Sequence, residues 1–279
     1  MNSNDGCENA NPSILLPDEF TGSRLVHKVQ ENQKIAYKGK IGRRREQYCL
    51  EQIRYMGVCH KKIGQDQLEY VKARGGGIAC GPGCSHCCRS VYVGATLQEC
   101  EAIAYYLSHH EELLCSFLAA YPAWWDKVTR GRAVFRECEQ LFVEMLREGI
   151  DTKKDKAFQS ALKRHNRQGI VCPFLLNDLC SIYDVRPANC AGFFVTHSPE
   201  LCRPKEGYEP KFNLTSIDDV LYDTSFYSGT LVHPMTLYLP VAVFSILESG
   251  FTFLGQLPGL AGMALEALND PEVRAIQSG

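Results

Sequence analysis

The sequence has few long apolar runs. Its two longest uncharged stretches, 231–247 and 249–265, are 17 residues each, and proline and glycine interrupt them. A helix needs about 20 predominantly apolar residues to cross a bilayer. We therefore expect these stretches to form buried helices and expect no membrane span.

We also expect no secretory leader. Residues 1–12 contain neither a basic segment nor an apolar segment, the two features of a signal peptide. With 14 cysteines, a secreted chain would suggest a disulfide framework. Without a leader we expect a cytoplasmic protein whose thiols stay reduced.

Net charge is low, with 30 Lys/Arg against 32 Asp/Glu, but it is unevenly distributed. Residues 24–74 contain 13 Lys/Arg and 5 Asp/Glu, whereas residues 206–279 contain 2 and 9. The two segments either neutralise each other on folding or form partner surfaces. The triplet at 43–45 is short and no aromatic-basic motif accompanies it, so no nucleic-acid partner is predicted. The partner, a protein or a small molecule, is not specified by the sequence.

Cysteine is abundant and concentrated. Residues 80–88 read Cys-Gly-Pro-Gly-Cys-Ser-His-Cys-Cys, which places four thiols on a turn rich in glycine and proline. Gly81 and Gly83 allow a tight backbone that aims successive sulfurs to one side. Thiolates on such a loop are typical ligands of soft metals. The ligand candidates in this group are Cys80, Cys84, Cys87 and Cys88.

A second cysteine group follows about eighty residues later and adds Cys172, Cys180 and Cys190. A structural zinc uses four ligands, and a [4Fe–4S] cluster uses four cysteines or three with an open iron. Seven thiols are more than a zinc site or a [4Fe–4S] cluster requires, so the sequence is compatible with one bound metal centre or with two. Adjacent Cys87 and Cys88 point in different directions, so one of them is expected to serve another purpose.

The spacing of Cys80, Cys84 and Cys87 also matches the three-cysteine motif of radical S-adenosylmethionine enzymes. That fold places its motif early in a barrel of alternating strands and helices, whereas 94–168 reads as successive helices. His86 also occupies a position that is usually aromatic. The spacing of the three cysteines is therefore the only support for S-adenosylmethionine as a cofactor.

Helical periodicity dominates the chain outside the cysteine groups. A capping box at Thr96 and Glu99 predicts a helix start at the next residue. Pro122 is expected in the first turn of a helix that Gly149 ends, with Cys138 on its core face. Cys115 is expected to pack in the same way.

The bounds of the other elements are predicted from glycine, proline and polar residues that end or interrupt helices. A helix should begin near Arg43, with Gly57 and Gly64 interrupting the chain after it. Residues 151–156 read as a solvated connector before a helix over 157–168. A short strand at 91–93 and C-terminal helices at 236–247 and 259–268 complete the expectation.

The predicted fold is mainly α, a helical domain around an irregular cysteine-rich metal-binding centre. We expect four segments in chain order: a disordered lead at 1–22, a basic helical extension at 23–75, the cysteine-cluster domain at 76–202, and an acidic-to-neutral helical region at 203–279.

The two cysteine groups together resemble the YkgJ-type cysteine-cluster family. The pattern of that family has a cysteine-rich opening that ends in Cys-Cys, then a helix, Cys-Pro-Phe/Leu-Leu, Cys followed by Ile/Val-Tyr, and Arg-Pro-x-x-Cys. Residues 78–194 supply each part in order. The resemblance implies a zinc- or iron-chelating domain. Flagellin lysine N-methylases resemble the same domain, which implies cluster-dependent methyl transfer as one activity.

A role for Arg186 beside the metal follows from a separate physical argument. Four thiolates on a dication leave about two negative charges, and a nearby guanidinium would stabilise them. The alternative is an ordinary turn in which Arg186 pairs with Asp184 or Glu99. Pro187 is expected to start a short helix.

The remaining candidate ligands are weaker. His86 and His197 are ligands by residue type only, as is the isolated pair at 59–60, and Cys202 lies near the motif but outside it. No catalytic residue is assigned. The sequence thus predicts a metal-binding cysteine-cluster protein, with an iron-sulfur [4Fe–4S] cluster favoured over zinc, and group-transfer or redox activity as a further hypothesis. The alternatives are a structural-zinc interaction module and a radical S-adenosylmethionine-type enzyme.

Overall fold

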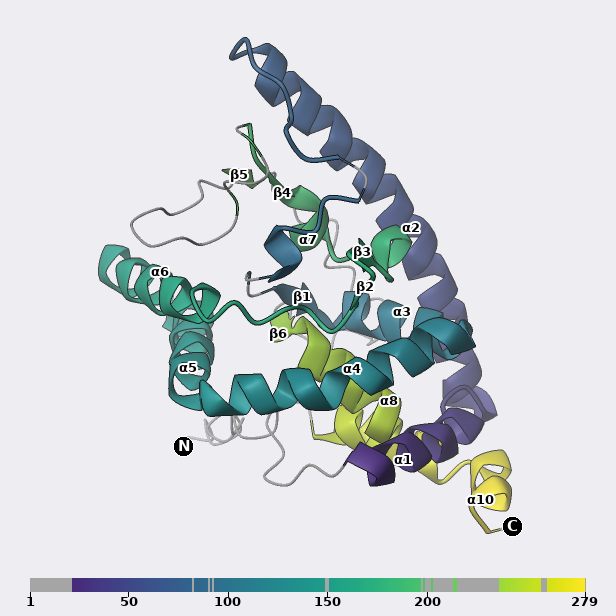
Figure 1. Ribbon diagram of the computed structural model, residues 1–279. Helices are drawn as coiled ribbons and strands as arrows, with labels where there is room; N and C mark the ends of the chain where they lie inside the picture. The colour runs from purple at the N-terminus through teal and green to yellow at the C-terminus, as the bar shows by residue number, and fades with distance from the viewer. Residues whose placement is uncertain are drawn as a thin grey trace, which may run out of the picture.

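The protein is mainly helical (Figure 1). The computed structural model describes residues 22–81, 83–89, 91, 93–148, 151–196, 198, 202, 213–214, 236–256 and 260–278. The helices are α1 (Gly22–Ile35), α2 (Gly39–Lys72), α3 (Leu97–Ser108), α4 (Glu111–Arg130), α5 (Arg132–Glu148), α6 (Thr152–Asn166), α7 (Ala188–Gly192), α8 (Leu239–Gly255), α9 (Ala261–Leu268) and α10 (Pro271–Ser278).

Strands in the described residues are short and pair two by two. The antiparallel pairs are β1 (Gly94–Thr96) with β6 (Thr236–Tyr238), β2 (Leu175–Leu176) with β3 (Leu179–Cys180), and β4 (Phe193–Phe194) with β5 (Asn213–Leu214). Two 3₁₀ turns, η2 (Cys87–Arg89) and η3 (Tyr183–Val185), lie in the cysteine-rich segments. The strand expected at 91–93 instead begins at Gly94.

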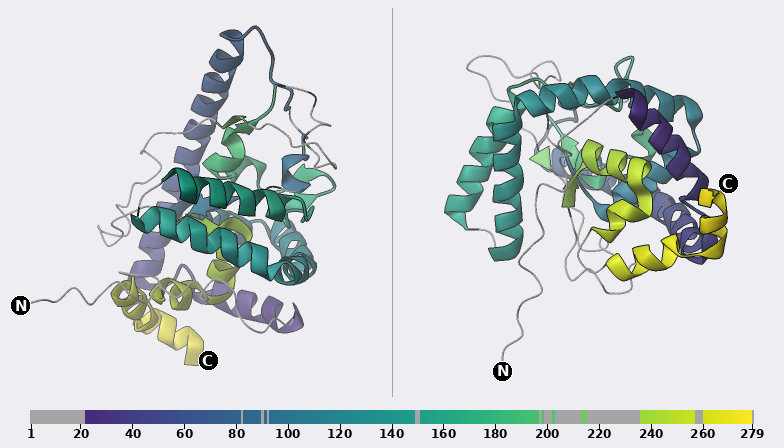
Figure 2. Two further views of the ribbon diagram at one scale, coloured as in Figure 1. Left: turned by 90° about the vertical axis from the view of Figure 1, so that its left-hand side faces the viewer. Right: turned by 90° about the horizontal axis from the view of Figure 1, so that it is seen from below.

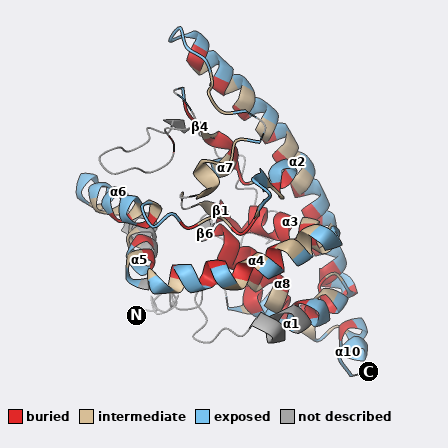
Figure 3. Cartoon of the chain, in the orientation of Figure 1, coloured by how far each residue is buried: buried red, intermediate tan, exposed pale blue. Residues whose placement is uncertain are grey.

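The core is built around α3 and α8, which Figure 3 shows as mostly buried. Helices α1, α2, α4 and α9 surround them, so residues from Val29 to Ala267 share one apolar cluster. The basic, cysteine-rich and acidic segments of the sequence therefore contribute to the same core. No helix in the described ranges combines the length and the apolarity that a bilayer crossing requires.

Helix α2 runs along one edge of the molecule, and its C-terminal turns extend beyond the core (Figures 1 and 2). Its 34 residues correspond to about 51 Å. The expected interruptions at Gly57 and Gly64 are wrong, because the helix continues through both. The buried face formed by Met56, Cys59 and Ile63 outweighs the roughly 1 kcal/mol that each helical glycine costs.

Helix α4 likewise continues through a predicted boundary. Pro122 lies inside the helix rather than in its first turn. Burial of Tyr121, Trp124 and Trp125 holds the segment in place despite the missing backbone donor. Cys115, which was expected in the core, is exposed.

Local capping explains where α3 and α6 begin. The expected capping box is present at the start of α3, where Thr96 and Glu99 each bond the other's backbone N–H. Helix α6 begins earlier than predicted, because the Asp151 carboxylate accepts hydrogen bonds from the amides of Lys153 and Lys154. The supposed connector at 151–156 is therefore largely the first turn of a helix. Cys138 lies in the core, as expected.

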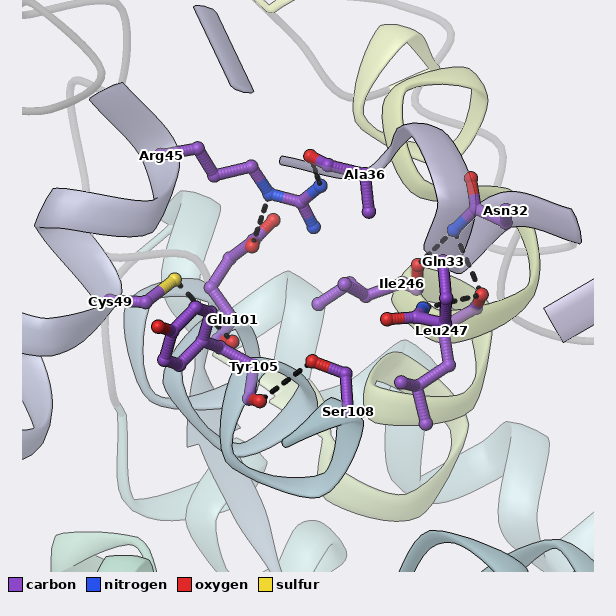
Figure 4. Close-up of polar contacts among 10 residues, drawn as sticks. All are labelled: Asn32, Gln33, Ala36, Arg45, Cys49, Glu101, Tyr105, Ser108, Ile246 and Leu247. Atoms are coloured by element: carbon purple, nitrogen blue, oxygen red, sulfur yellow. Dashed lines mark hydrogen bonds and ion pairs between the residues drawn. The ribbon is translucent and has the colours of Figure 1, made fainter. Parts of the chain in front are cut away.

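A buried ion pair joins α2 to α3 (Figure 4). Arg45 Nε donates to Glu101 Oε2 at 2.7 Å, and another guanidinium nitrogen donates to the Ala36 carbonyl at 3.2 Å. Both charged side chains are at most 1% exposed. The guanidinium also lies over the rings of Tyr37 and Phe251. Removal of either charge would leave its partner buried and uncompensated.

Helices α1 and α8 meet at a break in α8. Gly250 has φ 44° and ψ −115°, so the helical hydrogen-bond pattern is interrupted there. Asn32 Nδ2 donates to the carbonyls of Leu247 at 2.8 Å and Ile246 at 3.3 Å (Figure 4). A Cβ on Gly250 would lie 2.7 Å from Asn32 Oδ1, so glycine is required for this contact.

The ion pair gives the first prediction. Glu101→Gln should lower the free energy of unfolding by about 3–5 kcal/mol, because it leaves the Arg45 charge buried without a counter-charge. Urea denaturation followed by far-UV circular dichroism measures this. Glu137→Gln is the matched control, because its pair with Arg164 is exposed and should contribute less than about 1 kcal/mol. Equal losses in the two variants would show that the buried pair does not hold α2 on α3.

Candidate metal centre

The two cysteine groups meet in space. The amide of Cys172 donates to the carbonyl of Cys88 at 2.7 Å, which joins the groups directly. The guanidinium of Arg89 forms an ion pair with Asp178, in the turn between β2 and β3. Asn177 and Asp178 both have positive φ, as a tight two-residue hairpin turn requires. Helix α2 packs against α7 and against η3, which follows this hairpin (Figure 1).

All seven cysteines that the sequence singled out line one pocket of about 490 Å³. Segment 80–88 supplies four of the thiols, and the hairpin with its flanking residues and α7 supply three. The thiols belong to Cys80, Cys84, Cys87, Cys88, Cys172, Cys180 and Cys190.

The turn that precedes the second thiol has the expected tight geometry. Gly83 has φ 82°, a conformation that favours glycine, and the amide of Cys84 bonds the carbonyl of Gly81 at 3.0 Å. The amide of Ala79 donates to the carbonyl of Val195 at 2.8 Å, which fixes the start of the loop.

Cys87 is the one thiol of the pocket whose pKa is lowered among those with a resolved shift. A hydrogen bond from Cys88 lowers the pKa of the Cys87 thiol to about 7, and the positive charge of Arg186 acts in the same direction. Burial raises the pKa of most of the other thiols, the hydrogen bond with Cys87 is the main cause for Cys88, and the charge of Cys87 adds to the increase in thiols of both groups. The affected thiols are Cys80, Cys88, Cys172, Cys180, Cys190 and Cys202.

The thiols of the second group are more deeply placed. Burial raises the pKa of Cys172 to about 12 and the pKa of Cys190 well above its ordinary value. Burial also raises the pKa of Cys180, although Arg186 opposes this. A cation would offset the cost of holding such thiolates in an apolar setting.

Within the described residues, no three Cys, His, Asp or Glu side chains are gathered as closely as in a formed metal site. The donor set nevertheless suits a soft metal, since all seven expected thiols line the pocket and Arg186 is its one charged residue among those described. A preformed set of ligands is not required, because metal binding and the ordering of ligands are commonly coupled.

Arg186 lies in the pocket wall beside these thiols. Its guanidinium carbon lies 3.7 Å from the centroid of the Tyr183 ring, and its buried Nε has no hydrogen-bond partner in the described part of the chain. The structure records no pairing with Asp184 or Glu99 among the described contacts. Its donors therefore remain available to the sulfur side of the pocket.

Helix α2 positions the backbone around Arg186, a role that sequence reasoning missed. His60 Nε2 donates to the Arg186 carbonyl at 2.7 Å, so that nitrogen is not a free metal ligand. Burial lowers the pKa of His60, which favours the neutral ring. Gln67 donates to the carbonyls of Ala191 and Gly192 in α7. A polar residue at helical spacing on a buried face was the only sequence signal for Gln67.

Glu99 ties the core to the pocket. Its Oε2 accepts from the Thr96 amide at 2.8 Å, and its Oε1 accepts from the Ala188 amide at 2.7 Å. Ala188 opens α7, the short helix predicted after Pro187, which also contains Cys190. Burial raises the pKa of Glu99, while these hydrogen bonds oppose the shift. The carboxylate thus fixes both the start of α3 and the start of α7.

The remaining candidates are distributed differently. Cys202 is buried, burial raises its pKa to about 12, and it interacts with Cys80, Cys84 and Cys87, so an eighth thiol lies near the site. His86 is not among the described residues that line the pocket, and His197 lies outside the described residues.

Comparisons with known proteins find no family model, no curated protein and no solved structure that matches the chain. The resemblance of residues 78–194 to the YkgJ-type family therefore stays a prediction, and function has to be inferred from the site itself.

Glu99 gives the second prediction. Glu99→Ala should lower the free energy of unfolding by roughly 2–6 kcal/mol, because the amides of Thr96 and Ala188 would both be buried without acceptors. It should also reduce metal retention, since Cys190 follows the freed start of α7. Thr96→Ala is the control, because it removes the cap at a cost of about 1 kcal/mol and leaves the bond to Ala188 in place. Urea denaturation and metal analysis measure both effects, and equal metal contents would contradict the role in positioning Cys190.

Proposed function

We propose that this protein binds a metal through the thiolates of the pocket, as an iron-sulfur centre in preference to zinc. One observation supports the proposal most strongly: seven cysteines from two distant parts of the sequence line a single pocket. Packing alone does not require this arrangement, because other cysteines, such as Cys49, Cys100 and Cys138, are absorbed singly into the core.

The charges around the thiols support the same proposal. Thiolates on a metal carry excess negative charge, and the Arg186 guanidinium lies near enough to act on Cys87 and Cys180. A hydrogen-bonding cation beside a thiolate-bound metal stabilises it. The residues that would hold the metal are drawn from the seven pocket cysteines.

Iron is favoured over zinc by the number of thiols. A closed zinc site uses four ligands, whereas the pocket offers seven, with Cys202 nearby. A [4Fe–4S] cluster would supply an iron that binds another ligand or transfers electrons. Methyl transfer is then the activity that the resemblance to the YkgJ-type family suggests, and redox chemistry is the second hypothesis.

The radical S-adenosylmethionine alternative loses support. Helices α3 to α6 follow one another directly, and the strands in the described residues are two or three residues long, so these residues form no barrel. A structural-zinc interaction module keeps one supporting observation: Leu50 and Val58 are exposed on α2, which also has an excess of basic residues.

The third prediction tests the ligands. Joint replacement of Cys84, Cys87, Cys172 and Cys190 by serine should reduce bound iron and zinc to background, because serine is a poor ligand for soft metals. Metal analysis of anaerobically purified protein gives the result. Cys115→Ser is the matched control, since that thiol is exposed and remote in sequence from both groups. Retention of metal by the quadruple variant would remove the proposed site.

The fourth prediction separates iron from zinc. Protein isolated without oxygen should be brown, and its broad visible absorption should bleach with dithionite and fade in air. The measurement is an absorption spectrum with parallel iron and zinc analysis. Colourless protein with one zinc per chain, after expression with ample iron, would support the structural-zinc module instead.

A further inference from the structure

The short turn η3 places an aromatic ring against the Arg186 guanidinium. Two buried side chains, Ile182 and Val185, anchor this turn in the core, and the amide of Val185 donates to the carbonyl of Ile182 at 3.0 Å. In a 3₁₀ turn, side chains three residues apart lie one above the other. Tyr183 and Arg186 have this spacing, and the guanidinium carbon lies 3.7 Å from the centroid of the ring.

The contact with a ring distinguishes Arg186 from several other arginines of the chain. Arg45, Arg89 and Arg164 each form an ion pair with a carboxylate, which uses their donors and offsets their charge. Among the described residues no carboxylate pairs with Arg186, and its buried Nε has no hydrogen-bond partner there. A ring contacts the face of a guanidinium, whereas the N–H donors lie in its plane. The ring of Tyr183 therefore holds Arg186 without using these donors.

The backbone of Arg186 is fixed as well, because His60 Nε2 donates to its carbonyl at 2.7 Å. Tyr183 and Arg186 both line the pocket, and the positive charge of Arg186 favours the thiolate forms of Cys87 and Cys180. The Tyr183 side chain is 46% exposed, so its ring covers one face of the guanidinium where the pocket meets solvent. Both ends of Arg186 are thus held at the pocket wall.

We propose that Tyr183 is a positioning residue whose ring holds the Arg186 guanidinium beside the pocket thiols, so that its N–H donors can bond the sulfurs around a metal. The inference rests on the proposed function for the metal, whereas the contact between ring and guanidinium requires none. Groups that hydrogen-bond the ligands of a metal change its affinity by about 10- to 100-fold. The contact should therefore affect metal affinity and also the side-chain signal of Arg186.

The first test measures the affinity of full-length protein for Co²⁺, a probe of thiolate sites, by competition with a chelator. Tyr183→Leu should weaken binding about two- to fivefold, which corresponds to an exposed cation–π contact, and Arg186→Gln at least about tenfold. Tyr183→Phe keeps the ring and should bind Co²⁺ as the unaltered chain does. If it loses as much affinity as Tyr183→Leu, the ring face is not what acts.

The matched control for the charge is Arg74→Gln. The Arg74 guanidinium also lies 3.7 Å from a ring, that of Tyr70, but Arg74 is not among the described residues that line the pocket. Its replacement should leave Co²⁺ affinity unchanged. An effect equal to that of Arg186→Gln would assign the loss to the overall charge of the protein and overturn the inference.

A double-mutant cycle shows whether Tyr183 acts through Arg186. In the Arg186→Gln background, Tyr183→Leu should change Co²⁺ affinity by less than about twofold, because no guanidinium remains to be positioned. A loss as large as in the unaltered chain would show that the ring acts independently of Arg186, and the positioning role would be wrong.

The second test detects the contact without a metal. In ¹H–¹⁵N NMR spectra of metal-free protein, the Nε–H signal of Arg186 is identified by its absence in Arg186→Gln. The ring current of Tyr183 should displace this signal, so Tyr183→Leu should move it and Tyr183→Phe should leave it near its original position. A signal that stays in place in Tyr183→Leu overturns the inference, whatever the metal content.

The two proposals fail separately. Protein in which Tyr183→Leu moves the signal, yet which never binds Co²⁺, iron or zinc, upholds the placement of Arg186 and removes the proposed metal centre. Protein that binds metal with equal affinity in all variants keeps the metal centre and overturns the positioning role of Tyr183.

Discussion

The pocket depends on one buried carboxylate. Glu99 accepts hydrogen bonds from Thr96 at the start of α3 and from Ala188 at the start of α7, so the helix at the centre of the core also fixes the helix that contains Cys190. Burial of a carboxylate is costly, and these bonds offset the cost. The same contact therefore stabilises the core and sets the position of a ligand candidate, so the site and the fold cannot vary independently here.

Helix α3 uses two acidic residues for two different attachments. Glu99 and Glu101 are two positions apart, about 200° around the helix, so their side chains leave in nearly opposite directions. Glu99 holds α7, and Glu101 holds Arg45 of α2. Helix α2 then reaches back to the pocket through His60 and Gln67, which bond backbone carbonyls around Arg186 and in α7. Contacts therefore join α3 to α2, α2 to α7, and α7 back to α3. The irregular cysteine segments are thus attached to three helices that also hold one another in place.

Sequence reasoning succeeded where the cause is local and was wrong where tertiary packing decides. The capping box of α3 and the core position of Cys138 were predicted because neighbours in sequence determine them. The expected interruption at Gly57 and the expected helix start at Pro122 are wrong, because burial of an extended helical face outweighs a local preference against helix. That the seven motif cysteines would line one pocket was predicted from residue type and loop composition. Which side chain holds the backbone carbonyl of Arg186 was not predicted, because His60 lies 126 residues away and nothing in its local sequence indicates this contact.

The irregular backbone of the cysteine segments has a physical use. A thiol on a long helix has a direction fixed by the helix, and neighbouring thiols diverge. The segment from Ala79 to Arg89 is instead held at a few points, by Val195, Cys172 and Asp178, with short turns between them. Turns between fixed points allow sulfurs to move together around an ion without disturbing α2 or α3. The thiols thus line one pocket, and an ion bound there, as proposed, would supply the attraction that gathers them as ligands.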